Sequence, residues 1–299
     1  MDKIENILLR VKYHKSSQWL QVRNLLLESI REFPENLRLK QELADLYMKQ
    51  KLFTRAIKIF QEILEITTDD PYVYLKAGNC FLFIKEYVLA IDYYEKSQIE
   101  LPEIAYNKAY ALSKIGDVNG SIKIMRKVLD EYSFSEAPFI FLSELYFNKR
   151  QYDKALKCLK KAENQFGRKG ELFYLKGLAY YHKGLWLQSY FELHQAERMK
   201  VENYQFYRNY GLVCEKIGKT EEAIKNLLKS IKLSPSSTTT YMELIKIYLT
   251  HDLIMEAYTI IQHAKRNVPF SISLSILYNQ ILQRINKLSN QMHLKEENV

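Results

Sequence analysis

Tyr152-Asp153-Lys154-Ala155-Leu156 decides the fold, because its pattern returns along the chain at a fixed interval. It returns as Thr220-Glu221-Glu222-Ala223-Ile224 and as Tyr87-Val88-Leu89-Ala90-Ile91. When such segments are placed in one frame, repeat units begin at residues 3, 37, 71, 102, 136, 170, 204 and 238. Every interval is 34 residues except one of 31, between 71 and 102. A period of this length indicates a repeat protein.

The columns of this frame show that the period is real. The twentieth place is small in seven of the eight units and reads Val22, Ala56, Ala90, Ser121, Ala155, Ser189, Ala223 and Ala257. The twenty-fourth place is always large and apolar and reads Leu26, Phe60, Tyr94, Met125, Leu159, Leu193, Leu227 and Ile261. The eighth place is small in six units, at Ala44, Gly78, Ala109, Ser143, Gly177 and Gly211. Small residues at two fixed places predict two elements that cross closely within each unit.

Each unit contains two stretches with apolar residues three or four places apart, the spacing of an amphipathic helix. A pair of such helices cannot bury both apolar faces alone, but stacked pairs can. Asp70 before Pro71 predicts a helix N-terminus, and Gly116, Gly184 and Gly218 fall at the turn between the two helices of their units. The sequence therefore predicts an all-α protein.

This pattern resembles the tetratricopeptide repeat (TPR) over residues 3–271. The resemblance implies a right-handed α-solenoid of helix–turn–helix units. We expect a single solenoid over residues 1–289, in which 272–289 form a C-terminal capping helix, and a flexible tail over 290–299. The 31-residue interval predicts a shortened second helix or a tighter turn between units.

Composition excludes several classes of protein. Nine glycines and six prolines in 299 residues are too few for the turns of an all-β fold. No apolar stretch approaches the ~20 residues of a membrane-spanning helix, and the first residues lack a secretory pattern. Three separated cysteines fit packing thiols in a reducing compartment. We therefore expect a cytoplasmic protein with no membrane span.

The resemblance also implies that the first helices line a concave groove for an extended peptide or a partner helix. Several places that usually face such a groove carry apolar and aromatic residues in the middle units. For places five and nine, packing between neighbouring helices is as good an explanation as binding. The expected groove residues are Leu75, Asn79, Tyr106, Asn107, Tyr110, Ile140, Glu144, Phe147, Tyr174, Leu178, Tyr181 and Arg208. We expect a non-enzymatic scaffold or adaptor for protein–protein interaction.

Catalytic, metal and cofactor sites are not expected, because the histidines and cysteines form no known ligand spacing and no nucleophile motif is present. An alternative function arises from the net charge of +9. Lysines of two expected second helices fall on the outer, convex face, at Lys154, Lys157, Lys160, Lys161, Lys225, Lys229 and Lys232. These lysines would suit a nucleic-acid-associated TPR factor, although a solvated helix face is the simpler explanation.

Overall fold

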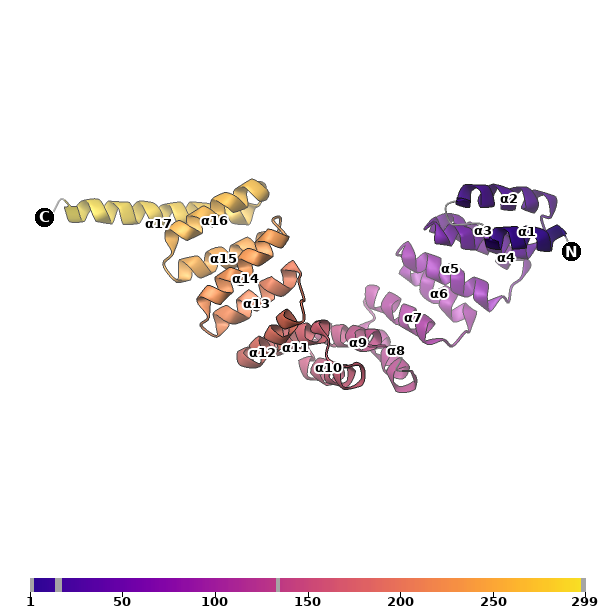
Figure 1. Ribbon diagram of the computed structural model, residues 1–299, viewed down its shortest axis with the longest axis horizontal. Helices are drawn as coiled ribbons and strands as arrows, with labels where there is room; N and C mark the ends of the chain where they lie inside the picture. The colour runs from indigo at the N-terminus through magenta and orange to yellow at the C-terminus, as the bar shows by residue number, and fades with distance from the viewer. Residues whose placement is uncertain (1–2, 14–17, 133–134, 297–299) are drawn as a thin grey trace. The chain divides into compact units, whose positions relative to one another are not determined.

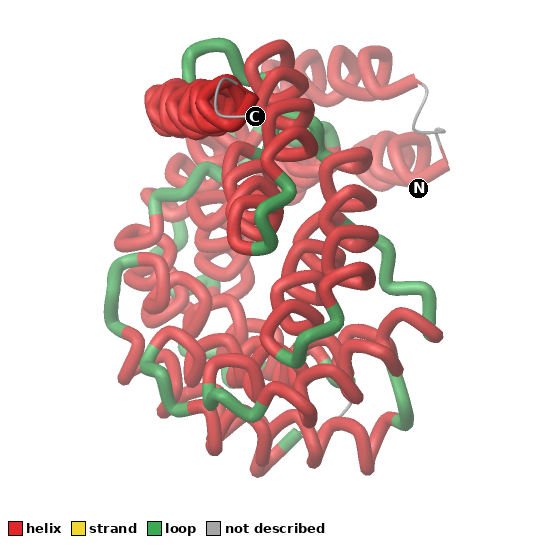
Figure 2. Tube along the Cα trace, turned by 90° about the vertical axis from the view of Figure 1, so that its left-hand side faces the viewer, coloured by secondary structure: helices red, strands yellow, loops and turns green. Residues whose placement is uncertain are grey.

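A computed structural model describes residues 3–13, 18–132 and 135–296, and all regular structure in these ranges is helical (Figures 1 and 2). The first helices of the units are α1 (Lys3–Tyr13), α3 (Leu37–Lys49), α5 (Pro71–Phe83), α7 (Pro102–Lys114), α9 (Ala137–Asn148), α11 (Gly170–His182), α13 (Tyr204–Lys216) and α15 (Thr238–Thr250). The second helices are α2 (Trp19–Glu32), α4 (Phe53–Ile66), α6 (Tyr87–Ser97), α8 (Val118–Glu131), α10 (Tyr152–Phe166), α12 (Trp186–Arg198), α14 (Thr220–Leu233) and α16 (Ile254–Asn267). Helix α17 (Ile272–Glu296) follows them. The all-α prediction is therefore confirmed.

The first helices begin at the predicted unit starts, with α9 one residue later, and every second helix begins at the seventeenth place. Capping chemistry explains some of these starts. The side chain of Asp70 accepts hydrogen bonds from the backbone N–H groups of Tyr72 and Val73, and Pro71 occupies the first turn of α5.

The turn inside each unit uses one backbone conformation. At the fifteenth place φ is positive in every unit from the second to the eighth. Glycine occupies the place at Gly116, Gly184 and Gly218, as the sequence predicts. The other units place a side chain in this left-handed region, at Lys51, Lys85, Arg150 and Asp252. The geometry of the hairpin therefore outweighs the local preference of these four residues.

The two helices of a unit cross where the frame has small residues. A Cβ on Gly177 would lie 2.7 Å from Leu193, and one on Gly211 would lie 2.9 Å from Leu227. The serines of the twentieth place also bond across the crossing. The hydroxyls of Ser121 and Ser189 donate to the eighth-place carbonyls of Ala109 and Gly177, each at 2.7 Å. The helices approach so closely at the crossing that only small residues fit, and a serine there can hydrogen-bond its hydroxyl to a backbone carbonyl. These two facts explain why Ala, Ser and Gly occupy the crossing.

The chain forms two compact units, residues 1–145 and 146–299, and each has its own apolar core. In the first, Leu26, Phe60 and Tyr94 from the second helices are buried together. In the second, Leu193, Leu227 and Ile261 play the same part. A single continuous solenoid over residues 1–289 stays a prediction.

Helix α17 packs on α16 and buries Leu274 and Ile281 completely in the core of the second unit. It therefore covers the apolar end of the last repeat, as a capping helix does. The helix continues to Glu296, past residue 289.

The 31-residue interval shortens the second helix of its unit. Helix α6 has 11 residues, whereas α4 and α8 have 14. It ends at Ser97, and the following residue, Gln98, has a φ of 51° that turns the backbone out of the helix. A cavity of about 770 Å³ lies beside this early end and is lined by α6, α7 and α8. The three residues by which this interval is shorter are therefore lost at the C-terminal end of α6, and the crossing of the two helices within the unit is unchanged.

Candidate protein-binding surface

The expected groove residues lie on first helices and are not part of either buried core. Eleven of the twelve are half-buried, and Glu144 is exposed. We call the exposed side of α1, α3, α5, α7 and α9 in the first compact unit, and of α11, α13 and α15 in the second, the first-helix surface. The two parts are described separately.

Polar residues on this surface pair between neighbouring first helices. Lys76 on α5 contacts Asp45 on α3 at 2.6 Å. The amide of Asn107 on α7 donates to Oδ1 of Asn79 on α5 at 3.1 Å, and the hydroxyl of Tyr94 donates to the same oxygen at 2.8 Å. Both pairs join the ninth place of one unit to the sixth place of the next. Asn79 and Asn107 therefore satisfy each other in part.

Further along the first compact unit, the contact between the ninth place of one unit and the sixth place of the next is made by aromatic residues. The ring of Phe141 on α9 lies 5.2 Å from that of Tyr106 and 6.0 Å from that of Tyr110, both on α7. Burial, and to a smaller degree the charge of Glu144, raises the pKa of Tyr106, so its hydroxyl stays a hydrogen-bond donor at neutral pH. Lys114 lies over the ring of Tyr110 at 4.9 Å. A tyrosine with a hydroxyl donor and neighbouring aromatic rings, such as Tyr106, suits contact with a protein partner.

The other two apolar groove residues of this unit contribute less. Leu75 packs against the core of the first compact unit from its edge. Ile140 is half-buried on α9, and its backbone carbonyl accepts from the hydroxyl of Ser143 at 2.7 Å.

In the second compact unit, the surface is built around Arg208 on α13. Its guanidinium lies 3.7 Å from Oε1 of Glu243 on α15. Its buried Nε has no hydrogen-bond partner among the described residues. Tyr174 and Tyr181 on α11 flank it closely enough for the arginine charge to act on both hydroxyls, and Leu178 lies between them on the same helix. Burial nevertheless raises the pKa of both tyrosines, and Asn209 donates to the Tyr174 hydroxyl at 2.9 Å.

One contact pattern was not predicted from the sequence. The seventeenth place of a unit lies against the thirteenth place of the next unit. Phe53 stacks on Phe83 with ring centroids 4.7 Å apart, and Tyr152 stacks on His182 at 5.2 Å. Phe147 joins the second pair edge-on, and together they line a cavity of about 610 Å³. Phe147 thus lies at the hairpin end of the helices, and His182 also contacts the ring of Tyr181 at 5.4 Å, which links this group to the cluster around Arg208.

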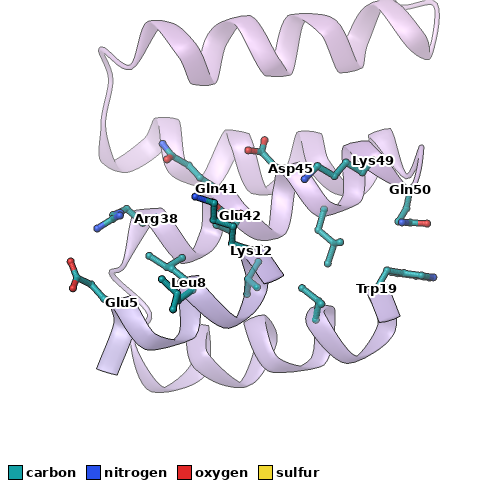
Figure 3. Close-up of a pocket in the computed structure, with 14 residues that line it drawn as sticks. Glu5, Leu8, Lys12, Trp19, Arg38, Gln41, Glu42, Asp45, Lys49 and Gln50 are labelled. Carbon is teal, nitrogen blue, oxygen red and sulfur yellow. The ribbon is translucent and has the colours of Figure 1, made fainter. Parts of the chain in front are cut away.

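A larger cavity lies on the first-helix surface between α1 and α3 (Figure 3). Its volume is about 1040 Å³. Leu8 and Trp19 supply apolar walls, while Arg38, Glu42 and Lys49 are among the charged residues that line it. The sequence did not single out this region, because its apolar residues also fit the first-unit core.

Two observations bear on chemistry. His251 contacts Thr220 at 3.2 Å and Glu215 at 3.0 Å, but both contacts are to Nε2. A catalytic relay places its nucleophile and its acid on opposite ring nitrogens, so this group lacks that geometry. Among the described residues, no three His, Cys, Asp or Glu side chains gather to hold a metal ion, and no helix is long and apolar enough to cross a membrane.

Comparisons with known proteins agree with the hairpin frame. Tetratricopeptide repeat family models match residues 15–78, and residues 139–164 and 204–237. A TPR repeat-containing protein of Methanocaldococcus jannaschii is 23% identical over 231 residues, which cover 62% of this chain and 41% of that protein. The chain thus spans less than half of the length of that relative.

Solved structures are similar in fold. The C-terminal part of a TPR repeat-containing protein from Cytophaga hutchinsonii has a TM-score of 0.64 at 17% identity, covering 80% of this chain and 98% of that one. A chain of the Cut9–Hcn1 hetero-tetramer of the APC/C has a TM-score of 0.58 at 16% identity, covering 94% of this chain and 55% of that one. Such low identities show the shared fold alone. The family-model matches and the curated relative, together with the repeated hairpins, support a tetratricopeptide repeat protein, and the solved structures share its α-solenoid fold.

Proposed function

We propose that this chain is a non-enzymatic scaffold or adaptor whose first-helix surface holds a peptide segment or a helix of a partner protein. The TPR fold supports protein interaction in general; the choice of surface and of ligand is our inference. A cytoplasmic location, a partner within a multiprotein assembly and one continuous solenoid belong to the same proposal.

The cluster around Arg208 supports this surface most strongly. A buried donor without a hydrogen-bond partner is uncommon in native proteins, because its desolvation is uncompensated. Because the Arg208 side chain is 29% exposed, a shift of its guanidinium would let a carbonyl or carboxylate oxygen of a bound peptide accept a hydrogen bond from this Nε. Tyr174 and Tyr181 beside it offer apolar contact area and hydroxyl donors, the combination that is enriched at binding hot spots.

Site-specific photo-crosslinking tests this proposal. A benzoylphenylalanine at Leu178, between the two tyrosines, should form adducts with partner proteins in an extract of the native cells. The same probe at Thr259, which is exposed on second helix α16, serves as the matched control. Arg208→Gln should reduce the Leu178 adducts without changing the far-ultraviolet circular dichroism. The proposal of a first-helix site would be contradicted if the probe at Thr259 gave as many adducts as the probe at Leu178. It would also be contradicted if Arg208→Gln left the yield of Leu178 adducts unchanged.

The exposed lysines of α10 support an anionic partner as a second candidate. Lys154, Lys157, Lys160 and Lys161 are all exposed, and no carboxylate of the described residues pairs with them. The nucleic-acid alternative predicts binding to RNA or DNA that weakens steeply with salt. Binding of a peptide to the apolar first-helix surface should change little over the same salt range.

A further inference from the structure

The second helices of three successive repeat units are α10, α12 and α14, and the outer sides of α10 and α14 carry lysines whose charge is not neutralised locally. Besides the four lysines of α10, Lys225 and Lys232 on α14 are exposed and have no carboxylate within ion-pair distance among the described residues. We call the outer sides of α10, α12 and α14, within the second compact unit, the second-helix surface; Figure 1 labels the three helices.

Most acidic residues of these helices turn inward. Glu163 on α10 and Glu192 on α12 both contact the buried ammonium of Lys176, each at 2.8 Å. Glu197 on α12 contacts Lys229 on α14 at 3.2 Å. Lys176 on α11 thus links α10 to α12 through its two carboxylate contacts, and the pair of Glu197 with Lys229 links α12 to α14. The exposed acids are few: Asp153 pairs with Lys183, and Glu221 lies in the first turn of α14.

Large apolar side chains stand out of the same surface. Leu187 and Phe191 are four residues apart on α12, hence on one face, and are 62% and 65% exposed. Leu228 on α14 is 41% exposed. In the repeat frame Phe191 occupies the twenty-second place, where α10 has Lys157 and α14 has Lys225. A row of protruding apolar groups is thus bordered by cations on both sides.

We propose that the second-helix surface binds peripherally to a membrane that contains anionic phospholipids. Lysines near such a membrane gain electrostatic attraction to its phosphate groups, and exposed Phe and Leu side chains gain by entering the apolar boundary below the headgroups. Neither contribution alone gives stable attachment, whereas the two together do.

The apolar row favours lipid over the other anionic partners. Nucleic-acid phosphates would attract the lysines but would leave Leu187 and Leu228 exposed to water. An acidic protein segment would need a recess to receive it. Side chains that are more than half exposed, such as Leu187 and Phe191, protrude instead of lining such a recess. A soft lipid surface accommodates protruding side chains.

Flotation of the full chain with vesicles tests the proposal. One set of vesicles contains phosphatidylcholine alone, and the other contains equal parts of phosphatidylcholine and phosphatidylglycerol. The chain should float with the anionic vesicles only. Lys157→Gln with Lys161→Gln should lower the partition coefficient roughly 25-fold, at roughly five-fold per lysine. Leu187→Ser with Phe191→Ser should lower it about ten-fold or more.

Matched controls come from the first compact unit. Lys58 on α4 occupies the same repeat place as Lys157, and Val88 on α6 occupies the same place as Leu187; both are exposed. Lys58→Gln and Val88→Ser should leave flotation unchanged. Because all the altered side chains are exposed, every variant should keep the thermal unfolding curve of the parent.

The proposal is overturned if the chain fails to float with anionic vesicles, or if the control variants lose flotation as much as the test variants do. It is also overturned if RNA or DNA binds and the lysine variant abolishes that binding while the Leu187 and Phe191 variant keeps both nucleic-acid binding and flotation. That result would assign the surface to nucleic acid.

Discussion

Replacement of Lys176 by methionine should destabilise the second compact unit more than any surface substitution. Lys176 on α11 is 4% exposed, and its ammonium lies 4.4 Å from the ring centroid of Phe173. Glu163 and Glu192 reach it from the second helices on either side, each at 2.8 Å. Methionine keeps most of the side-chain volume but removes the charge, so two half-buried carboxylates would face each other without a cation.

The expected cost follows from the burial of the three side chains. Loss of one partner from a buried ion pair destabilises proteins by about 3–5 kcal/mol. The side chains of Glu163 and Glu192 keep 23% and 19% exposure, so water can partly solvate them. We therefore expect the lower end, about 3 kcal/mol. For a unit of this size, that corresponds to a fall of about 6–12 °C in the Tm.

Thermal unfolding followed by circular dichroism and calorimetry measures the effect. Lys183→Met, which breaks the exposed pair with Asp153, is the matched control and should cost less than about 1 kcal/mol. Adding Glu163→Gln and Glu192→Gln to Lys176→Met should restore much of the lost stability, because no buried charge then remains. A Tm for Lys176→Met equal to that of Lys183→Met would refute the reasoning.

Three further predictions concern backbone strain, proton binding and thiols. Lys85 has a φ of 67°, so Lys85→Gly should stabilise the chain by about 0.5 kcal/mol in urea unfolding, since relief of left-handed strain slightly exceeds the added chain entropy; a destabilised variant would contradict this. Burial, and then the charge of Arg150, lowers the pKa of His182 below 6.5, so stability from this group is present above that pH and declines as the pH falls through it; Arg150→Gln should raise the pKa in an NMR titration, and an unchanged titration would exclude the arginine as a cause. Burial raises the pKa of each cysteine to about 12, so native protein should resist iodoacetamide at mildly alkaline pH while the unfolded chain is alkylated at all three; rapid alkylation of native protein would disagree with this burial. The cysteines are Cys80, Cys158 and Cys214.

Helix positions could be predicted from the sequence because the repeat columns record packing constraints within one hairpin. A small residue such as Ala155 is required wherever two helices cross, and a large one such as Leu159 fills the space beside it. These requirements are local, so they recur every 34 residues and reveal the frame. The 31-residue interval predicted either a shortened second helix or a tighter turn between units, and the structure has the shortened helix.

Contacts between units were harder to predict, because they join places that differ in residue type from unit to unit. The contact of places nine and six is an ion pair at Asp45–Lys76 and an amide pair at Asn79–Asn107. The stacking of Tyr152 on His182 likewise joins the seventeenth place of one unit to the thirteenth place of the next, and the residue types differ from those of the equivalent pair Phe53–Phe83. Lys176 occupies the seventh place of its unit, for which the repeat pattern predicted no contact.

These pairings decide where a partner can gain affinity on the first-helix surface. Asn79 and Asn107 already bond to each other, so a ligand that uses them must first replace an existing hydrogen bond and gains little. Arg208 differs, because its Nε gives up no hydrogen bond when it donates to a ligand. An alanine scan of the twelve expected groove residues should therefore find its largest losses of affinity at Arg208 and the adjacent Tyr174 and Tyr181, and small losses at the asparagines. Equal losses of affinity at all twelve residues would mean that hydrogen bonds between side chains of this chain do not determine which residues a partner uses.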